Sequence, residues 1–160
     1  MYKVIDIIRG TTVDGPGFRT SIYFSGCIHE CPGCHNPQSW NPNFGRNMSL
    51  MDIMEVVEEE DFDVTLTGGD PLYHPLLLKK LVDSLKANKR NVWIYTGFTW
   101  EEILKNKDLK NAIESADVLV DGRYDKTLRD PDLPFRGSRN QRIIDIRLSL
   151  ETGRIYTCNY

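Results

Sequence analysis

The residues best suited to chemistry are three cysteines that fall within eight positions of one another. Cys27, Cys31 and Cys34 follow the spacing C-x3-C-x2-C, with turn-forming glycine and proline residues beside and between them. Three thiolates this close in sequence cannot share one face of a regular strand, so we expect a loop wrapped around a bound group. Soft thiolate ligands favour zinc or an iron–sulfur cluster.

Two kinds of metal group fit this spacing, and they differ in the number of protein ligands that they need. A structural zinc ion takes four ligands, and four side chains could supply the fourth: His29, His35, His74 and Cys158. A cubane cluster held by three cysteines instead leaves one iron open to a small molecule with amino and carboxylate groups. The pattern favours the iron–sulfur cluster, with zinc as the alternative.

Length and composition limit the architecture. The chain has 160 residues, of which 40% are hydrophobic and 27% charged, which predicts a single globular domain over residues 1–160 and excludes disordered and coiled-coil classes. The net charge of −3 provides no basic field to attract nucleic acid or an anionic membrane. A closed eight-fold β/α barrel needs roughly 250 residues, so this chain can hold only part of one.

No targeting or membrane segment is expected. The first ten residues include Lys3, Asp6 and Arg9, which interrupt any secretory apolar region. No apolar run approaches the ~20 residues that span a bilayer. We therefore expect a cytoplasmic protein, in which thiols stay reduced and clustered cysteines serve a metal or catalysis.

Strands alternating with helices would position these residues. Buried strands are expected at residues 20–24, 64–67, 92–95 and 118–120, and each ends at a turn that contains glycine. Helical patterns lie between them, one beginning at Ser49 with Asp52 and another at Thr99 with Glu102, two capping boxes. The alternation predicts a mainly parallel sheet whose carboxyl ends form a common binding edge.

The two ends of the chain have different patterns. Residues 4–8 could form an additional strand that leads into the turn Asp14-Gly15-Pro16-Gly17. Residues 143–150 and 154–157 flank Glu151-Thr152-Gly153, a pattern that predicts a C-terminal β-hairpin.

Five motifs together resemble a known enzyme family. The cysteine spacing resembles that of radical S-adenosylmethionine (SAM) enzymes, and V-D-G-P-G-F-R at residues 13–19 resembles the entry motif of glycyl-radical-enzyme activases. Residues 66–72 (L-T-G-G-D-P-L), 117–124 and 135–141 (F-R-G-S-R-N-Q) narrow the similarity to the activases of anaerobic ribonucleotide reductases. This resemblance implies a partial, open β/α barrel of the radical SAM type.

The resemblance also implies roles for particular residues. Cys27, Cys31 and Cys34 would bind a 4Fe-4S cluster, and SAM would be held by Gly33, Cys34, His35, Gly68, Gly69, Asp70, Thr96, Asp121 and Arg123. Asp14, Arg19 and Arg136 would border the approach of a substrate peptide. The reduced cluster would cleave SAM, and the 5′-deoxyadenosyl radical would take a hydrogen from a glycine of the reductase.

The implied partners are the large subunit of an anaerobic ribonucleotide reductase and a flavodoxin-like electron donor, with no nucleic acid and no membrane. Two alternatives stay open. One keeps the chemistry and changes the partner to another glycyl radical enzyme of the formate-lyase type. The other is a zinc-binding adaptor without catalysis.

Overall fold

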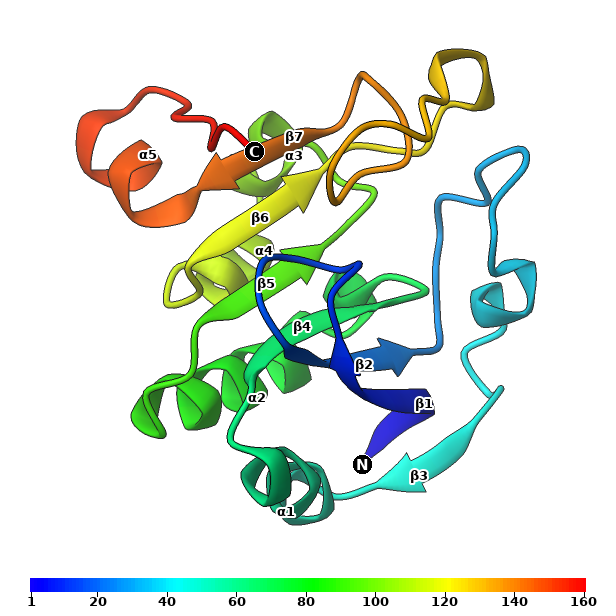
Figure 1. The fold of residues 1–160 in the computed structure, drawn as a ribbon, viewed down its shortest axis with the longest axis vertical. Helices are drawn as coiled ribbons and strands as arrows, with labels where there is room; N and C mark the ends of the chain where they lie inside the picture. Colours follow the sequence, from blue (N-terminus) through cyan, green and yellow to red (C-terminus); the bar gives the residue numbers. More distant parts are fainter.

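The computed structural model describes residues 1–160 and contains one seven-stranded sheet (Figure 1). The strands are β1 (Tyr2–Thr11), β2 (Arg19–Phe24), β3 (Arg46–Met48), β4 (Asp63–Gly68), β5 (Val92–Tyr95), β6 (Val118–Asp121) and β7 (Arg142–Asp145). Their order across the sheet is β3-β1-β2-β4-β5-β6-β7. The strands β3 and β7 form its two edges, so the sheet is open and does not close into a barrel.

The middle of the sheet is parallel, as the strand and helix alternation predicts. β2 pairs with β4, β4 with β5, and β5 with β6, all in parallel. The additional strand expected at residues 4–8 is part of β1, which runs antiparallel to both β2 and β3. β7 is antiparallel to β6. The four expected strands are confirmed as the parallel centre, and antiparallel pairing adds β1 and β3 on one side of it and β7 on the other.

The helices form on local signals that the sequence carries. They are α1 (Leu50–Glu60), α2 (Pro75–Ala87), α3 (Trp100–Leu104), α4 (Lys107–Ile113) and α5 (Ile146–Thr152), with short 3-10 turns η1 (Pro37–Trp40), η2 (Pro71–Tyr73) and η3 (Lys126–Leu128). The two predicted capping boxes are present: Ser49 caps α1 with Asp52, and Thr99 caps α3 with Glu102. Each pair satisfies backbone N–H groups that the first helical turn leaves free.

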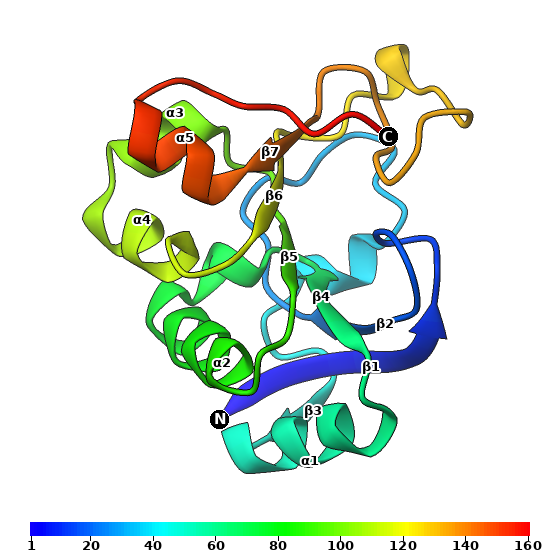
Figure 2. The same ribbon diagram turned by 60° about the vertical axis from the view of Figure 1, so that its left-hand side comes forward.

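Apolar side chains of the strands and helices meet on one face of the sheet. Successive residues of a strand point to opposite faces, so Val64 and Leu66 of β4 face the helices while Thr65 and Thr67 face away. The helix-covered face holds a core cluster of 25 buried residues. Figure 2 shows the helices on one side and long loops on the other.

The predicted C-terminal β-hairpin is wrong. After β7 the chain forms α5, whose first turn is capped by Asp145 accepting from the Leu148 N–H, and Gly153 ends it in the left-handed conformation. Residue Thr157 then returns to Ile144 through a single isolated bridge. Residues 143–150 alternate between apolar and polar as a strand would. The helix is formed instead, and it places Ile146 in the core on the helix side of the sheet.

The loops that follow the parallel strands gather where the carboxyl ends of these strands meet. In Figure 1 the segment after β2 lies opposite the segment between β6 and β7 at this end of the sheet. The residues between β1 and β2 cross in front of the sheet. No helix is both long and apolar enough to cross a bilayer.

Candidate functional site

The three cysteines of the motif line one open pocket at the carboxyl ends of the parallel strands. Cys27, Cys31 and Cys34 are free thiols of intermediate exposure. The pocket has an empty volume of about 860 Å³ and is also lined by the ends of β4 and β5. The parallel topology therefore brings the cysteine loop and the glycine-rich loop after β4 to one place.

Backbone hydrogen bonds fasten the cysteine loop to the loop after β4. The Gly69 N–H donates to Phe24 O over 2.7 Å, and the Asp70 N–H donates to Gly26 O over 2.8 Å. The Gly26 N–H donates in turn to Ser39 O over 2.7 Å. The start of the cysteine loop is thus held on both sides before any ligand binds.

The close packing of the cysteine loop on the loop after β4 explains why Gly68 and Gly69 have no side chain. Gly68 has a φ of +107°, and a Cβ there would lie 2.3 Å from Phe24 N. A Cβ on Gly69 would lie 2.6 Å from Gly26 O. Both glycines line the pocket, and their lack of a side chain lets the backbone of one loop pack on the other.

Burial and backbone contacts act on the thiols of the cysteine loop. Burial raises the pKa of Cys27 and of Cys31. Cys34 Sγ accepts a hydrogen bond from the Asn36 N–H at 3.4 Å. No three His, Cys, Asp or Glu side chains converge closely enough to hold a single metal ion. In a cubane each cysteine binds a different iron, so its ligands need not converge on one point.

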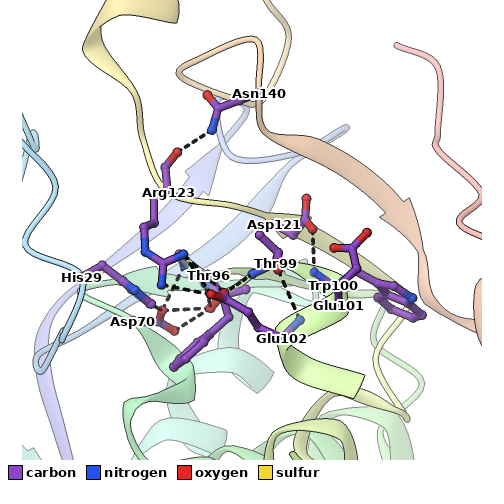
Figure 3. A network of polar contacts seen from close by, with 12 residues as sticks. His29, Asp70, Thr96, Thr99, Trp100, Glu101, Glu102, Asp121, Arg123 and Asn140 are labelled. Carbon is purple, nitrogen blue, oxygen red and sulfur yellow. Dashed lines mark hydrogen bonds and ion pairs between the residues drawn. The ribbon is translucent and has the colours of Figure 1, made fainter. Parts of the chain in front are cut away.

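Asp70 lies beneath the pocket and does not line it. Its carboxylate is 1% exposed and accepts a hydrogen bond from Thr96 Oγ1 (Figure 3). The Gly97 N–H and the Leu72 N–H donate to the same carboxylate. It also contacts His29 Nε2 at 2.7 Å. The sequence identified Asp70 and Thr96 as neighbours in function, and the structure adds His29 between them and the cysteines.

Asp121 is buried in a second polar network at the end of β6. It accepts from the Trp100 N–H at the start of α3 and pairs with the guanidinium of Arg142 on β7. Arg142 also binds Glu101 of α3 with two hydrogen bonds. Asp121 therefore joins β6, β7 and α3, and it does not line the pocket.

Arg123 is half exposed and lies beside the pocket. Its guanidinium pairs with Glu102 of α3 at 3.2 Å (Figure 3). It lines an adjoining recess together with His29 and Cys31. Gly33, in the left-handed conformation at φ +79°, does not line the main pocket.

Asp14 and Arg136 border a recess that adjoins the main pocket. Both line it, together with His35 and Tyr95, which line the main pocket as well. Asp14 is fixed there because its Oδ2 accepts from the Tyr23 hydroxyl at 2.8 Å. The structure thus brings two of the three residues predicted at the peptide approach next to the cysteine pocket.

Arg19, the third residue predicted at the peptide approach, is instead buried at the far end of β2. Its side chain is almost fully enclosed, and Nε donates to Thr65 Oγ1 while Nη2 donates to Val64 O, each over 2.8 Å. The guanidinium also lies over the ring of Trp93, 5.5 Å from its centroid. Burial lowers the pKa of Arg19. These contacts anchor the open face of the sheet and leave Arg19 without access to a docking peptide.

The structure brings half of the predicted site residues, seven of fourteen, to one pocket. Lining it are Cys27, Cys31, Cys34, His35, Gly68, Gly69 and Thr96. Sequence reasoning gave no site role to several others that line it: Asn36, Trp40, Tyr95, Tyr124 and Gln141. Tyr95 precedes Thr96 and Tyr124 follows Arg123 in the sequence. Their position beside predicted site residues could have identified both tyrosines as lining residues. No sequence pattern indicated Trp40, because it follows the cysteine loop and reaches the pocket only through the turn η1.

Comparisons with known proteins find an iron–sulfur domain and a group of activating proteins that are similar to this chain. A family model described as a 4Fe-4S single cluster domain matches residues 13–144. An Escherichia coli K12 protein named anaerobic ribonucleoside-triphosphate reductase-activating protein is 34% identical over 157 residues, covering 91% of this chain and 97% of that protein. A phage T4 protein of the same name is 36% identical over 139 residues, covering 82% and 86%.

A Haemophilus influenzae protein with this name is 34% identical over 149 residues, covering 85% of this chain and 93% of that protein. The similarity thus extends over most of the chain and over almost the full length of these relatives. The residues matched by the family model include the cysteine loop, the glycine loop after β4 and the segment after β6. The chain belongs to the family of anaerobic ribonucleoside-triphosphate reductase-activating proteins.

Proposed function

We propose that this protein activates an anaerobic ribonucleotide reductase by reductive cleavage of SAM at a 4Fe-4S cluster. The observation that carries the proposal is the gathering of three free thiols with Gly68, Gly69 and Thr96 in one open pocket. The names of the relatives support the reductase as the target. The finer class, a radical SAM enzyme with a partial β/α barrel, is part of this proposal.

The donor set fits the cofactors. Cys27, Cys31 and Cys34 would hold the cluster, and three thiolates for four irons leave one coordination site for the amino and carboxylate groups of SAM. When bound, the cluster supplies one electron to SAM, whose cleavage supplies the radical that takes a hydrogen atom from a glycine of the reductase. Loss of the thiol protons accompanies binding of the metal.

The remaining residues of the pocket position SAM. The carbonyls of Gly68 and Gly69 are suited to accept hydrogen bonds from its amino group, since no side chain stands in front of them. Thr96, His35 and the residues after β6 border the space that its adenosine part would take. Arg123 is the nearby cation suited to a carboxylate.

The recess beside the pocket is suited to the glycine-bearing segment of the reductase. Asp14 and Arg136 present opposite charges at its border, and it joins the cysteine pocket through His35 and Tyr95. An open pocket is required when the substrate is part of another protein. A flavodoxin-like donor would supply the electron, and we place the reaction in the cytoplasm.

Anaerobic reconstitution tests this function. The protein with iron and sulfide should bind a 4Fe-4S cluster, release methionine and 5′-deoxyadenosine from SAM under reducing conditions, and give a glycyl doublet in electron paramagnetic resonance (EPR) with an anaerobic ribonucleotide reductase. A doublet formed only with a formate-lyase-type enzyme would reassign the partner. One tightly bound zinc and no SAM cleavage would overturn the proposal in favour of an adaptor.

A further inference from the structure

The carboxylate of Asp70 has no capacity left for a ligand. Its two oxygens accept hydrogen bonds from the Leu72 N–H, Thr96 Oγ1 and the Gly97 N–H, and His29 Nε2 lies 2.7 Å from Oδ2. A carboxylate offers about four lone-pair positions, and these four donors use them. Asp70 therefore acts on the pocket through the side chains that it holds.

His29 is the one of these partners that connects Asp70 to the cysteine loop. Its side chain is 2% exposed. The ring packs edge-on against Phe98, with centroids 4.6 Å apart, and a Cβ on Gly97 would lie 2.3 Å from His29 Cδ2. Packing and the hydrogen bond together hold the imidazole in one orientation.

The second ring nitrogen of His29 is buried and has no partner. The Asp70 carboxylate can only accept a hydrogen bond, so Nε2 is the donor and carries a hydrogen. In the neutral tautomer with that hydrogen on Nε2, Nδ1 has a free lone pair. Nδ1 makes no hydrogen bond in the structure although it is buried. A buried polar atom without a partner lowers the stability of the fold, so we expect Nδ1 to have a partner when the protein is complete with its bound groups.

The surroundings of His29 indicate a metal as that partner. His29 stands between Cys27 and Cys31 in sequence and lines the same pocket as all three cysteines. A histidine that donates one ring N–H to a carboxylate and leaves the other nitrogen free is the usual arrangement of a metal-ligating histidine. The carboxylate fixes the tautomer and makes the free nitrogen a better ligand.

We propose that His29 Nδ1 binds the fourth iron of the cluster when SAM is absent, and that Asp70 is the positioning residue for this ligand. The proposal rests on the cluster and SAM assignments above. When SAM arrives, the bond between iron and Nδ1 breaks and bonds from iron to the SAM amino and carboxylate groups form. The ammonium group of SAM releases its proton to solvent as its nitrogen binds iron, the imidazole proton stays on Nε2, and no electron is transferred. His29 thus protects the reactive iron until SAM is present.

Pulsed EPR of the reduced, SAM-free protein tests this ligand. Before measurement, iron and sulfide analysis establishes four irons per chain. Protein labelled with 15N-histidine should show the strong hyperfine coupling of a directly bound imidazole nitrogen, and the coupling should disappear on addition of SAM. In His29→Ala it should be absent with SAM or without. His35→Ala, which alters the other histidine of the pocket, should keep the SAM-free coupling.

Asp70→Asn examines the positioning role. The variant keeps the size of the side chain but removes the charge that orients His29, so the coupling should change in magnitude while the iron content stays at four. Absence of histidine coupling in the wild-type cluster, its persistence in His29→Ala, or its persistence with SAM bound would overturn the proposal. Because these spectra need no turnover, failure of SAM cleavage in the wild type would count against the proposed function alone.

Discussion

The two faces of the central sheet contain residues of opposite character, although the same strands build both. On the helix side, Leu66 and Ile94 belong to a continuous apolar core. On the open side, the adjacent residues Thr65 and Tyr95 are linked to loops by hydrogen bonds, and the Tyr95 hydroxyl donates to Phe135 O. Alternation along each strand therefore separates the residues that stabilise the fold from those that surround the site.

The open face is stabilised by fewer and more directional contacts. Its apolar cluster contains four buried residues around Trp93, compared with 25 on the helix side. Burial raises the pKa of Tyr95, so its hydroxyl stays a donor. A polar face of this kind can hold loops in place and still leave an open pocket at its edge. The two faces should consequently respond differently to substitution.

The largest effect is expected at the cysteine loop. Cys31→Ala removes one of three cluster ligands, so iron binding and SAM cleavage should be lost while the free energy of unfolding of the metal-free protein changes little. Iron content and product analysis measure this. Cys158→Ala, at the apolar end of the open face, serves as the control and should retain the cluster. Full activity in Cys31→Ala would remove that residue from the ligand set.

Adjacent residues of β4 provide the next comparison. Leu66 is fully buried on the helix side, and Leu66→Ala should lower the free energy of unfolding by about 2–5 kcal/mol because it leaves a cavity. Thr67→Ala alters a residue that lines the pocket and should cost less than about 1 kcal/mol. Urea denaturation of the metal-free protein distinguishes them, and equal losses would contradict the division between the faces.

Two threonine hydroxyls compare a polar contact of the open face with a hydroxyl on the helix side. Thr65 Oγ1 accepts from Arg19 Nε and donates to Asp14 O, so Thr65→Val should cost about 1–3 kcal/mol by leaving both partners unsatisfied. Thr20 of β2 is the register partner of Val64, so it faces the helix side, and its buried hydroxyl has no partner. Thr20→Val should therefore leave the free energy of unfolding unchanged or raise it. Equal changes in the free energy of unfolding for the two variants would contradict this prediction.

The smallest effect is a dependence of stability on pH at the end of β7. Hydrogen bonds from Arg142 lower the pKa of Glu101 from 4.5 to about 2. Because folding favours the carboxylate, the stabilisation is present above pH 4.5 and is lost as pH falls toward about 2. Glu101 is half exposed, so we expect less than about 1 kcal/mol.

Urea denaturation along this pH range measures the effect. In Glu101→Gln the side chain no longer titrates, and the decline of stability with falling pH should be shallower than in the wild type. An identical pH dependence in the two proteins would show that the pair between Glu101 and Arg142 contributes nothing to stability.

Local features were predictable because their causes lie within a few residues. The capping box of Ser49 and Asp52 requires only a three-residue separation, and the alternation of strands and helices implied the parallel centre of the sheet. The C-terminal hairpin was wrong for the converse reason. Residues 143–150 alternate like a strand, and only the core that receives Ile146 favours the helix.

The sequence by itself determined the family, because the order of the motifs is a property of the chain alone, and the spacing of Cys27, Cys31 and Cys34 predicts the ligand set. Only the tertiary structure decided that Arg19 is buried and that Asp70 holds His29. These partners are separated by 41 residues or more. Their pairing depends on the register of neighbouring strands and on the few donors that can reach a buried charge, which no local pattern specifies.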